Sequence, residues 1–433
     1  MPEERSKERS PATPGRGSLL CGESHYKWFA LALLWVTYFL LQGTRQIYGA
    51  TLPQIRIDFG VTDVQMGVVA SVFFLAYAIA VPFGGFAADF FRRKWVIVVG
   101  SALFVVGVFA ASFAATIGMM VLTYGILNGV GQSLVPTPST SILQQLHKES
   151  RSTALSIYQL AAYVGIILCS VMAGWLGSLG AGGWRRAFLA FGGFGILWTL
   201  ALVFCLRDTP PAETAGAAVP QASFREAWLA MFSKPSAILM TLVFGLGNFG
   251  DIGFRTWMPT YLQRSFADMT PASAAFHSVF WFYAGGFFGI LVASRVSDGW
   301  RRRGNVGSRL DCNLIGHVLC AAFIVAVASV SGSLPALAAT LVGYGFVHGF
   351  YDANFIASFY EVITPRYRTS AYGLYSAGAF LIGSFAPAVL GWLGGAFSLR
   401  TAFAMLGLFY IVAAALTATA RIRFFKRDYI KED

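Results

Sequence analysis

The chain has 433 residues, of which 56% are hydrophobic and 12% charged, and its formal net charge is +12. This charged share is about half of that in a soluble globular domain, so the composition excludes an ordinary soluble protein and indicates a membrane protein. The 39 Phe and 47 Gly agree, because aromatic belts and close glycine contacts are common in membrane helices. The cysteines have no CxxC spacing, so no disulfide framework and no metal site are expected.

Residues 1–26 mix charge, Pro, Gly and Ser without an apolar run, which predicts a disordered tail rather than a cleaved signal peptide. Apolar runs long enough to cross about 30 Å of hydrocarbon then recur about twelve times. The expected fold is therefore an all-α membrane protein. The predicted spans are 28–50, 64–84, 95–115, 119–143, 153–176, 186–206, 237–262, 272–296, 312–330, 334–358, 371–394 and 401–420.

The basic residues predict the orientation of these spans, because Lys and Arg beside a span are retained in the cytoplasm. Most of them fall on one side, in the first tail and near 92–94, 301–303 and 421–431. We therefore expect a multi-pass protein of a bacterial inner membrane with both termini in the cytoplasm, and no binding of nucleic acid. The predicted outer side keeps only Arg56, Arg185, Arg186, Arg264 and Arg400.

The longest predicted loop, 207–234, is rich in Pro and Ala and divides the chain into six-span halves at 27–206 and 235–422, followed by a tail at 423–433. If the halves are repeats, a feature of one should recur in the other. The loop after the second span does so, as GGFAADFFRRK at 84–94 and ASRVSDGWRRR at 293–303. Each copy has a small residue, an acid and a basic cluster, so the loop either latches one conformation or only fixes the topology.

These loops resemble the cytoplasmic signature of the major facilitator superfamily, a small-residue GxxxD followed by Arg and Lys. The signature residues are Gly85, Asp89, Arg93 and Lys94, with Asp298 and Arg302 in the second copy. Phe90, Arg92 and Ser294 depart from the family pattern. The resemblance implies two pseudo-symmetric six-helix bundles that rock about a central site, a mechanism known as alternating access.

Arg45 lies inside the first predicted span, where a guanidinium could hold a carboxylate or phosphate. Its surroundings, up to Ala50 and Pro53, resemble the organophosphate:phosphate antiporters and the anion:cation symporters, in which an Arg here helps to bind the anion. The alternative is that Arg45 extends to the outer headgroups near Gln54 and Arg56. Uncharged candidates for contact with the substrate are Tyr48, Gln132, Gln159 and Asn354.

The seventh predicted span contains Asp251 and Arg255, one helical turn apart, and ends in WMPTYL at 257–262, which resembles the same anion carriers. In that alignment Asp251 takes the place of a second phosphate-binding Arg, which argues against phosphate exchange. Asp251 could instead carry a coupling proton, or Asp251 and Arg255 could form a purely structural pair.

The tenth predicted span contains His348 and Asp352, also one turn apart, and this spacing allows a hydrogen bond that could carry a proton. We therefore expect Asp352 and His348 to take part in proton coupling. Glu361, close to Arg366 and Arg368, is expected to be a solvated charge near the cytoplasmic exit.

Enzyme motifs such as GxSxG, HExxH and the Walker loop do not occur in the sequence, so neither catalysis nor a cofactor is expected. The interpretation that fits best is a monomeric, proton-coupled secondary transporter of a small organic anion. A proton-driven efflux carrier for drugs, with Arg45 structural, is the alternative. A receptor or scaffold that transports nothing is a third class.

Overall fold

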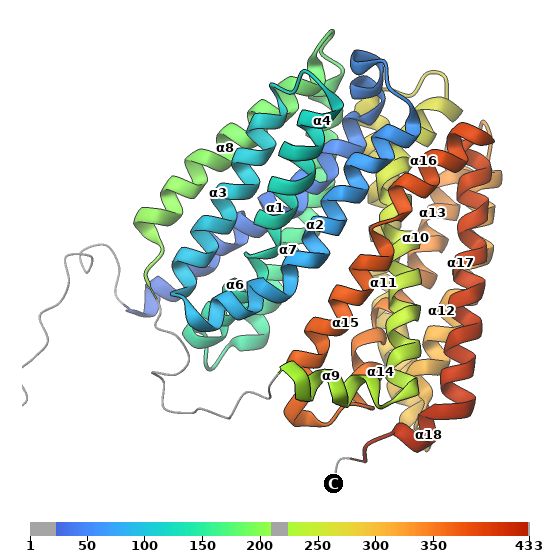
Figure 1. Cartoon of the computed structure of the whole chain (residues 1–433). Helices are drawn as coiled ribbons and strands as arrows, with labels where there is room; N and C mark the ends of the chain where they lie inside the picture. Colours follow the sequence, from blue (N-terminus) through green and yellow to red (C-terminus); the bar gives the residue numbers. More distant parts are fainter. Residues whose placement is uncertain (1–22, 209–223, 432–433) are drawn as a thin grey trace, which may run out of the picture.

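The computed structural model describes residues 23–208 and 224–431, so most of the predicted tail at 1–26 and of the loop at 207–234 lies outside the described residues. The described residues form helices joined by short turns (Figure 1). The first half contains α1 (Glu23–Phe59), α2 (Asp63–Phe90), α3 (Arg93–Ala111), α4 (Ile117–Met120), η1 (Val121–Leu127), α5 (Asn128–Ser133), α6 (Pro136–Leu146), α7 (Arg151–Gly177) and α8 (Gly183–Cys205). The second half contains α9 (Phe224–Phe232), α10 (Pro235–Ser265), α11 (Pro271–Arg302), α12 (Ser308–Ser329), α13 (Leu334–Asp352), α14 (Phe355–Tyr360), η3 (Pro365–Tyr367), α15 (Arg368–Gly383), α16 (Ala386–Ala396), α17 (Leu399–Thr419), η4 (Ala420–Phe424) and α18 (Phe425–Asp428).

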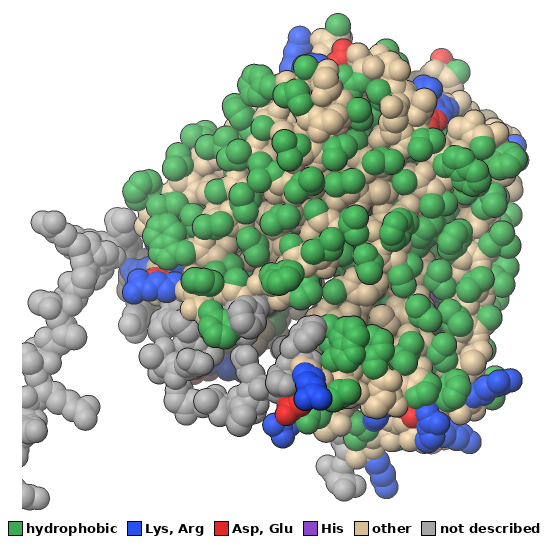
Figure 2. Space-filling view, viewed as in Figure 1, with side chains coloured by type: hydrophobic (Ala, Val, Ile, Leu, Met, Phe, Trp, Pro, Cys, Tyr) green, Lys and Arg blue, Asp and Glu red, His purple; other side chains and the backbone are tan. Residues whose placement is uncertain are grey.

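Within the described part of the chain, 9 helical segments are long and apolar enough to cross a membrane. The three other predicted spans coincide with α1, with the column from α4 to α6 and with α13 followed by α14. These columns carry Arg45, Gln132 and His348 inside otherwise apolar runs. Figure 2 shows apolar side chains over the middle of the visible surface and charged side chains near its two ends, as a membrane protein requires.

Three predicted spans are interrupted rather than continuous. The fourth contains the π-helical turns of η1 and breaks before Pro136, which has no N–H to donate and therefore starts the new helix α6. The tenth breaks after Asp352, and the eleventh breaks before Ala386 and Pro387. Such breaks are tolerated in a membrane where the freed backbone is buried in protein.

The helices form two bundles, one from each half, whose ribbons meet at one end of the molecule and diverge toward the other (Figure 1). We call the end with the C-terminus and α9 the terminal end, and the opposite end the distal end. The halves meet through α2 with α15 and α16, α1 with α10, and α7 with α11. Glycines permit this approach, since a Cβ at Gly67 would clash with the carbonyl oxygen of Pro387, and one at Gly174 with that of Pro271.

At the distal end one carboxylate joins the two halves. Asp63, in the first turn of α2, is 6% exposed and accepts both terminal nitrogens of Arg264, at 2.7 and 2.8 Å. Arg264 belongs to the last turn of α10, and Arg56 adds a third ion-pair contact to Asp63 at 2.8 Å. A bidentate contact of this kind is among the strongest that an exposed pair can form, so it favours the state in which the halves are closed here.

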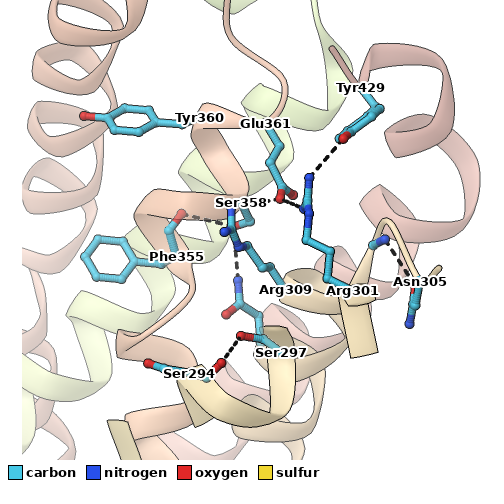
Figure 3. A network of polar contacts seen from close by, with 12 residues as sticks. Ser294, Ser297, Arg301, Asn305, Arg309, Phe355, Ser358, Tyr360, Glu361 and Tyr429 are labelled. Carbon is cyan, nitrogen blue, oxygen red and sulfur yellow. Dashed lines mark hydrogen bonds and ion pairs between the residues drawn. The ribbon is translucent and has the colours of Figure 1, made fainter. Parts of the chain in front are cut away.

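At the terminal end Glu361 is buried, which corrects the expectation of a solvated charge. It forms ion pairs with Arg301 and with Arg309, the latter at 2.9 Å, and Arg301 also donates to the hydroxyl of Tyr429 at 2.9 Å (Figure 3). Burial raises the pKa of the Glu361 carboxyl above its ordinary value, although both arginines act to lower it. Arg366 and Arg368, the partners expected from sequence, bind Glu226 and two backbone carbonyls instead.

The last described residues complete this network. The carboxylate of Asp428 accepts the backbone N–H of Ser236 at 3.0 Å and its hydroxyl at 2.7 Å, so it caps the first turn of α10. Lys234 donates to the carbonyl oxygen of Asp428 at 3.0 Å, and the N–H of Ile430 donates to that of Glu361 at 2.9 Å. The C-terminal segment is thus docked on the second half.

Candidate functional site

The first half presents one cation inside the membrane-spanning region, Arg45 of α1. Its Nε donates to Oε1 of Gln132 at 2.6 Å, and Gln132 is completely buried in α5. The amide nitrogen of Gln132 donates to Thr44 at 3.0 Å and to Asn128 at 2.9 Å, which fixes the orientation of its amide group. We call Thr44, Arg45, Asn128 and Gln132 the first-half cluster.

Arg45 has only neutral neighbours in this cluster. Its guanidinium lies 4.5 Å from the ring centre of Tyr77 and 5.9 Å from that of Phe73, both on α2. Among residues 23–208 and 224–431, no Asp or Glu lies within ion-pair distance of Arg45. Its contacts with Gln132 and Tyr77 point into the protein, so the structure does not support the alternative in which Arg45 extends to the outer headgroups.

The second half places two carboxylates and a cation in the same region. Asp251 and Arg255 of α10 form an ion pair, and Arg255 also donates to the hydroxyl of Tyr283 on α11 at 2.9 Å. The pair follows from the predicted spacing of one helical turn. Arg255 therefore already has a partner for its charge, in contrast to Arg45.

The other carboxylate, Asp352, ends α13 and pairs with His348 one turn earlier, with 3.1 Å between Oδ2 and Nδ1. The side chain of Asp352 is 38% exposed, whereas that of His348 is 6% exposed. Nε2 of His348 is buried without a hydrogen-bond partner among the described residues. We call Asp251, Arg255, Tyr283, His348 and Asp352 the second-half cluster.

Aromatic side chains from the two halves meet beside each cluster. Tyr163 of α7 packs edge-on against Tyr283 with ring centres 5.6 Å apart, and it lies close enough to Asp352 for an electrostatic interaction. Tyr77, which covers Arg45, packs against Phe380 of α15 with ring centres 5.0 Å apart. These four rings lie on the boundary between the halves, which we call the seam, and each pair of rings lies beside one of the two clusters.

The structure does not bring all of the predicted binding residues to this seam. Gln159 is exposed one turn before Tyr163, so it lies on the face of α7 that borders the seam. Tyr48 is 1% exposed and donates to the backbone oxygen of Met66 at 2.7 Å, which places it in the packed core. Asn354 is 2% exposed and donates to the carbonyl of Phe350 at 3.0 Å. In this conformation Tyr48 and Asn354 support the helices and do not line the seam.

Sequence reasoning missed Asn128, Tyr77 and Tyr283. Asn128 could have been found, because it lies one helical turn before Gln132 and an amide pair at this spacing can hydrogen-bond. Tyr77 and Tyr283 gave no such signal, since each contacts its arginine from a different helix.

The signature loops are described only in part. Gly85 and Asp89 belong to α2, but the surroundings of both residues lie outside what the structure describes. Arg93 is buried at the start of α3, and the Lys94 ammonium lies 5.6 Å from the ring centre of Trp95. In the second copy Asp298 and Arg302 are exposed, and it is Arg301 that binds Glu361.

Comparison with known proteins gives a consistent group of relatives. Residues 34–310 match the Major Facilitator Superfamily. The probable sulfoacetate transporter SauU of Cupriavidus necator is 25% identical over 391 residues, which cover 84% of this chain and 86% of that protein. The cis,cis-muconate transport protein of Acinetobacter baylyi is 25% identical over 391 residues, covering 85% and 88%. A solved bacterial homolog of the human lysosomal transporter Spinster, described as inward-facing and unoccupied, has a TM-score of 0.83 at 19% identity, over 95% of this chain and all of that one.

Proposed function

The chain belongs to the Major Facilitator Superfamily, and from this premise we propose that it moves a small organic anion together with protons by alternating access. The site that we propose for the anion is the seam between the first-half and second-half clusters. As a family of membrane transporters, the superfamily makes this chain a multi-pass transport protein and not an enzyme.

The observation that carries the proposal is the unpaired charge of Arg45. A charge inside the bilayer costs about 2.5 to 3.5 kcal/mol even on the lenient insertion scale, so such a charge is expected to be functional. The amides and the aromatic ring around Arg45 hold the guanidinium but do not neutralise it. An anionic substrate would supply the missing charge in a bidentate contact.

The names of two relatives refine the substrate class. Sulfoacetate and cis,cis-muconate are both small organic acids with two anionic groups. In a dianion, one group would bind Arg45 and the other would point across the seam toward Arg255 and Tyr283. Arg255 keeps Asp251 as a partner, so the second contact would be weaker than the first.

For the coupling proton we propose Asp352 with His348. Asp352 is the more exposed of the two carboxylates in the second-half cluster, and its partner is a histidine rather than an arginine. A proton can therefore reach Asp352 without breaking an Arg–carboxylate pair. Asp251, bound to Arg255, would hold that cation in place.

We also propose that the terminal end faces the cytoplasm of a bacterial cell and that the protein works as a monomer. The excess of basic residues near this end supports the orientation. In that orientation the helices are closed on the outer side by Asp63 and Arg264 and diverge toward the cytoplasm, as in an inward-facing state.

Uptake into proteoliposomes tests the proposal. The panel would contain sulfoacetate, cis,cis-muconate, acetate, a sugar phosphate and a cationic dye, each with and without an inward proton gradient. We expect uptake of at least one dianion, its stimulation by the gradient and its loss in Arg45→Ala. Arg295→Ala, which removes an exposed arginine of α11, is the matched control. If only the dye moves and Arg45→Ala transports it normally, the protein is a drug carrier and the proposal is wrong.

A further inference from the structure

A second histidine lies buried in the core of the second half, away from the seam. His317 of α12 is completely buried, and its Nδ1 lies 2.7 Å from the carbonyl oxygen of Asn313. A carbonyl oxygen can only accept, so Nδ1 must carry the ring proton. Nε2 of His317 is then a bare lone pair, and it has no hydrogen-bond partner among the described residues.

His348 has the same arrangement. Its Nδ1 lies 3.1 Å from a carboxylate oxygen of Asp352, so the proton of the neutral ring is on Nδ1 and Nε2 is bare. This Nε2 is also buried without a partner in the described part of the chain. Two imidazoles therefore each offer an unused proton acceptor inside the same bundle.

One aromatic ring lies against both histidines. The ring centre of Tyr351 is 4.7 Å from that of His317 and 5.7 Å from that of His348. Tyr410 of α17 lies 6.3 Å from His317. His348 and Asp352 both act electrostatically on His317, and Asp352 also acts on His348.

The titratable groups around His317 determine how much charge this region can hold. They are His348, Tyr351 and Asp352 on α13, Tyr410 on α17 and Cys320 on its own helix. Asp352 is the only carboxylic acid among them, and Asp251, which also acts on His348, is paired with Arg255. Two imidazolium ions would repel each other in a buried site where Asp352 is the one carboxylic acid without an arginine partner, so the site has room for one added proton.

We propose that His317 and His348 form a two-imidazole site that shares the coupling proton. This rests on the proposed proton symport and identifies His317 as a further residue of its machinery. A proton bound at Nε2 of His348 gives an imidazolium whose Nδ1–H donates to the Asp352 carboxylate, so that the pair is neutral overall. A proton bound at Nε2 of His317 leaves His348 neutral and places the charge farther from the seam.

Nuclear magnetic resonance of the full-length protein in lipid nanodiscs, with nitrogen-15 in its histidines, tests the proposal directly. The chain has 5 His, so few signals need to be assigned. At high pH we expect both rings to show a bare Nε2 and a protonated Nδ1. On acidification the signals of both rings should move together, with one proton taken up between them.

Variants separate the shared site from two independent histidines. In His317→Gln, His348 should titrate alone, in a single step and at a higher pH than in the parent protein, because its competitor is gone. In Asp352→Asn, uptake at both rings should shift to lower pH. His277→Gln, which removes a histidine that accepts a hydrogen bond from Trp281 on α11, is the matched control and should leave His348 unchanged. If the ring signals of His317 do not change with pH, the proposal is overturned. The same holds if His348 titrates in His317→Gln as it does in the parent protein.

A transport measurement adds a second readout. With a transported anion, His317→Gln should keep counterflow exchange and shift the pH profile of gradient-driven uptake, and His317→Asn should do the same if the glutamine variant folds poorly. An unchanged profile in both variants contradicts the proposal. The nuclear magnetic resonance result does not require a substrate, so failure of the anion proposal remains distinguishable from failure of the shared site.

Discussion

The two halves of the molecule differ in whether their charged side chains between the ends have charged partners. In the first half Arg45 is held by the amide of Gln132 and the ring of Tyr77, and it keeps its full charge. In the second half Arg255 is paired with Asp251, and Asp352 is paired with His348. This difference agrees with the proposed roles, in which the fixed cation Arg45 binds the anion and the titratable pair of His348 and Asp352 binds the proton. Four substitutions would break or sharpen this contrast.

Gln132→Glu should have the largest effect, because it gives Arg45 the internal partner that Arg255 already has. The new carboxylate would take the position of an oxygen that now lies 2.6 Å from Nε. Loss of a charge-assisted contact costs about 1.5 to 3 kcal/mol, which weakens anion binding roughly 10- to 150-fold. Isothermal titration calorimetry with the transported anion measures this. Gln145→Glu, at the terminal end of α6, is a control for the added charge, and equal losses in both variants would refute the specific role of Gln132.

Asp352→Asn should remove the coupling and leave the binding. We expect gradient-driven accumulation to fall more than tenfold, because the asparagine cannot take up a proton, while counterflow exchange stays within about twofold. The two assays use the same proteoliposomes with and without a pH gradient. Asp268→Asn, an exposed acid in the turn between α10 and α11, serves as the control. Loss of both activities would make Asp352 a structural residue instead.

Asp251→Asn tests whether Arg255 can be made to resemble Arg45. Removing the carboxylate leaves a cation that only Tyr283 contacts, so the variant should be less stable by about 1 to 3 kcal/mol, below the range for fully buried pairs because both side chains are partly exposed. The added anion should then stabilise Asp251→Asn more than the parent protein in a thermal shift assay. If the anion restores no stability to the variant, Arg255 does not face the substrate.

Asp63→Asn should have the smallest effect. It changes the contact between the two halves and therefore the separation of the two clusters. It removes the bidentate contact with Arg264 that joins the halves at the distal end. Because the Arg264 side chain is 37% exposed, solvent screens the contact even though Asp63 is buried, and we expect it to contribute about 1 kcal/mol. The population open at the distal end should then rise roughly fivefold. Labelling of a cysteine placed at Ser71, in the closed interface, measures that population. Asp58→Asn, whose partner Arg185 lies in the same half, is the control, and unchanged labelling would show that glycine packing alone closes this end.

Much of the fold was predictable because the apolar runs are long and local. The all-helical, two-bundle architecture and the family resemblance are confirmed. The pairs Asp251–Arg255 and His348–Asp352 also form as their spacing of one turn indicated. Residues one turn apart on a helix lie next to each other, so a sequence alone can predict such a pair.

Contacts between helices were not predictable in the same way. Glu361 was expected beside Arg366 and Arg368, its neighbours in sequence, but it binds Arg301 and Arg309 from other elements. Tyr48 was a candidate for contact with the substrate, yet its hydroxyl is bound to the backbone oxygen of Met66. Which face of a helix meets which neighbour depends on the packing of both bundles, and a single sequence does not contain that information.

The docked C-terminal segment has a consequence for biosynthesis. Asp428, which caps the first turn of α10, is translated only after the residues of the earlier membrane helices, α17 included. Until then the N–H of Ser236 and the ammonium of Lys234 lack this partner, although α10 is already inserted. A chain that stops early would keep all of its spans and still lack the bonds that close this end of the second bundle. The cap of α10 therefore comes from a residue 192 positions later in the chain, so this end of the second bundle closes long after α10 has been synthesised.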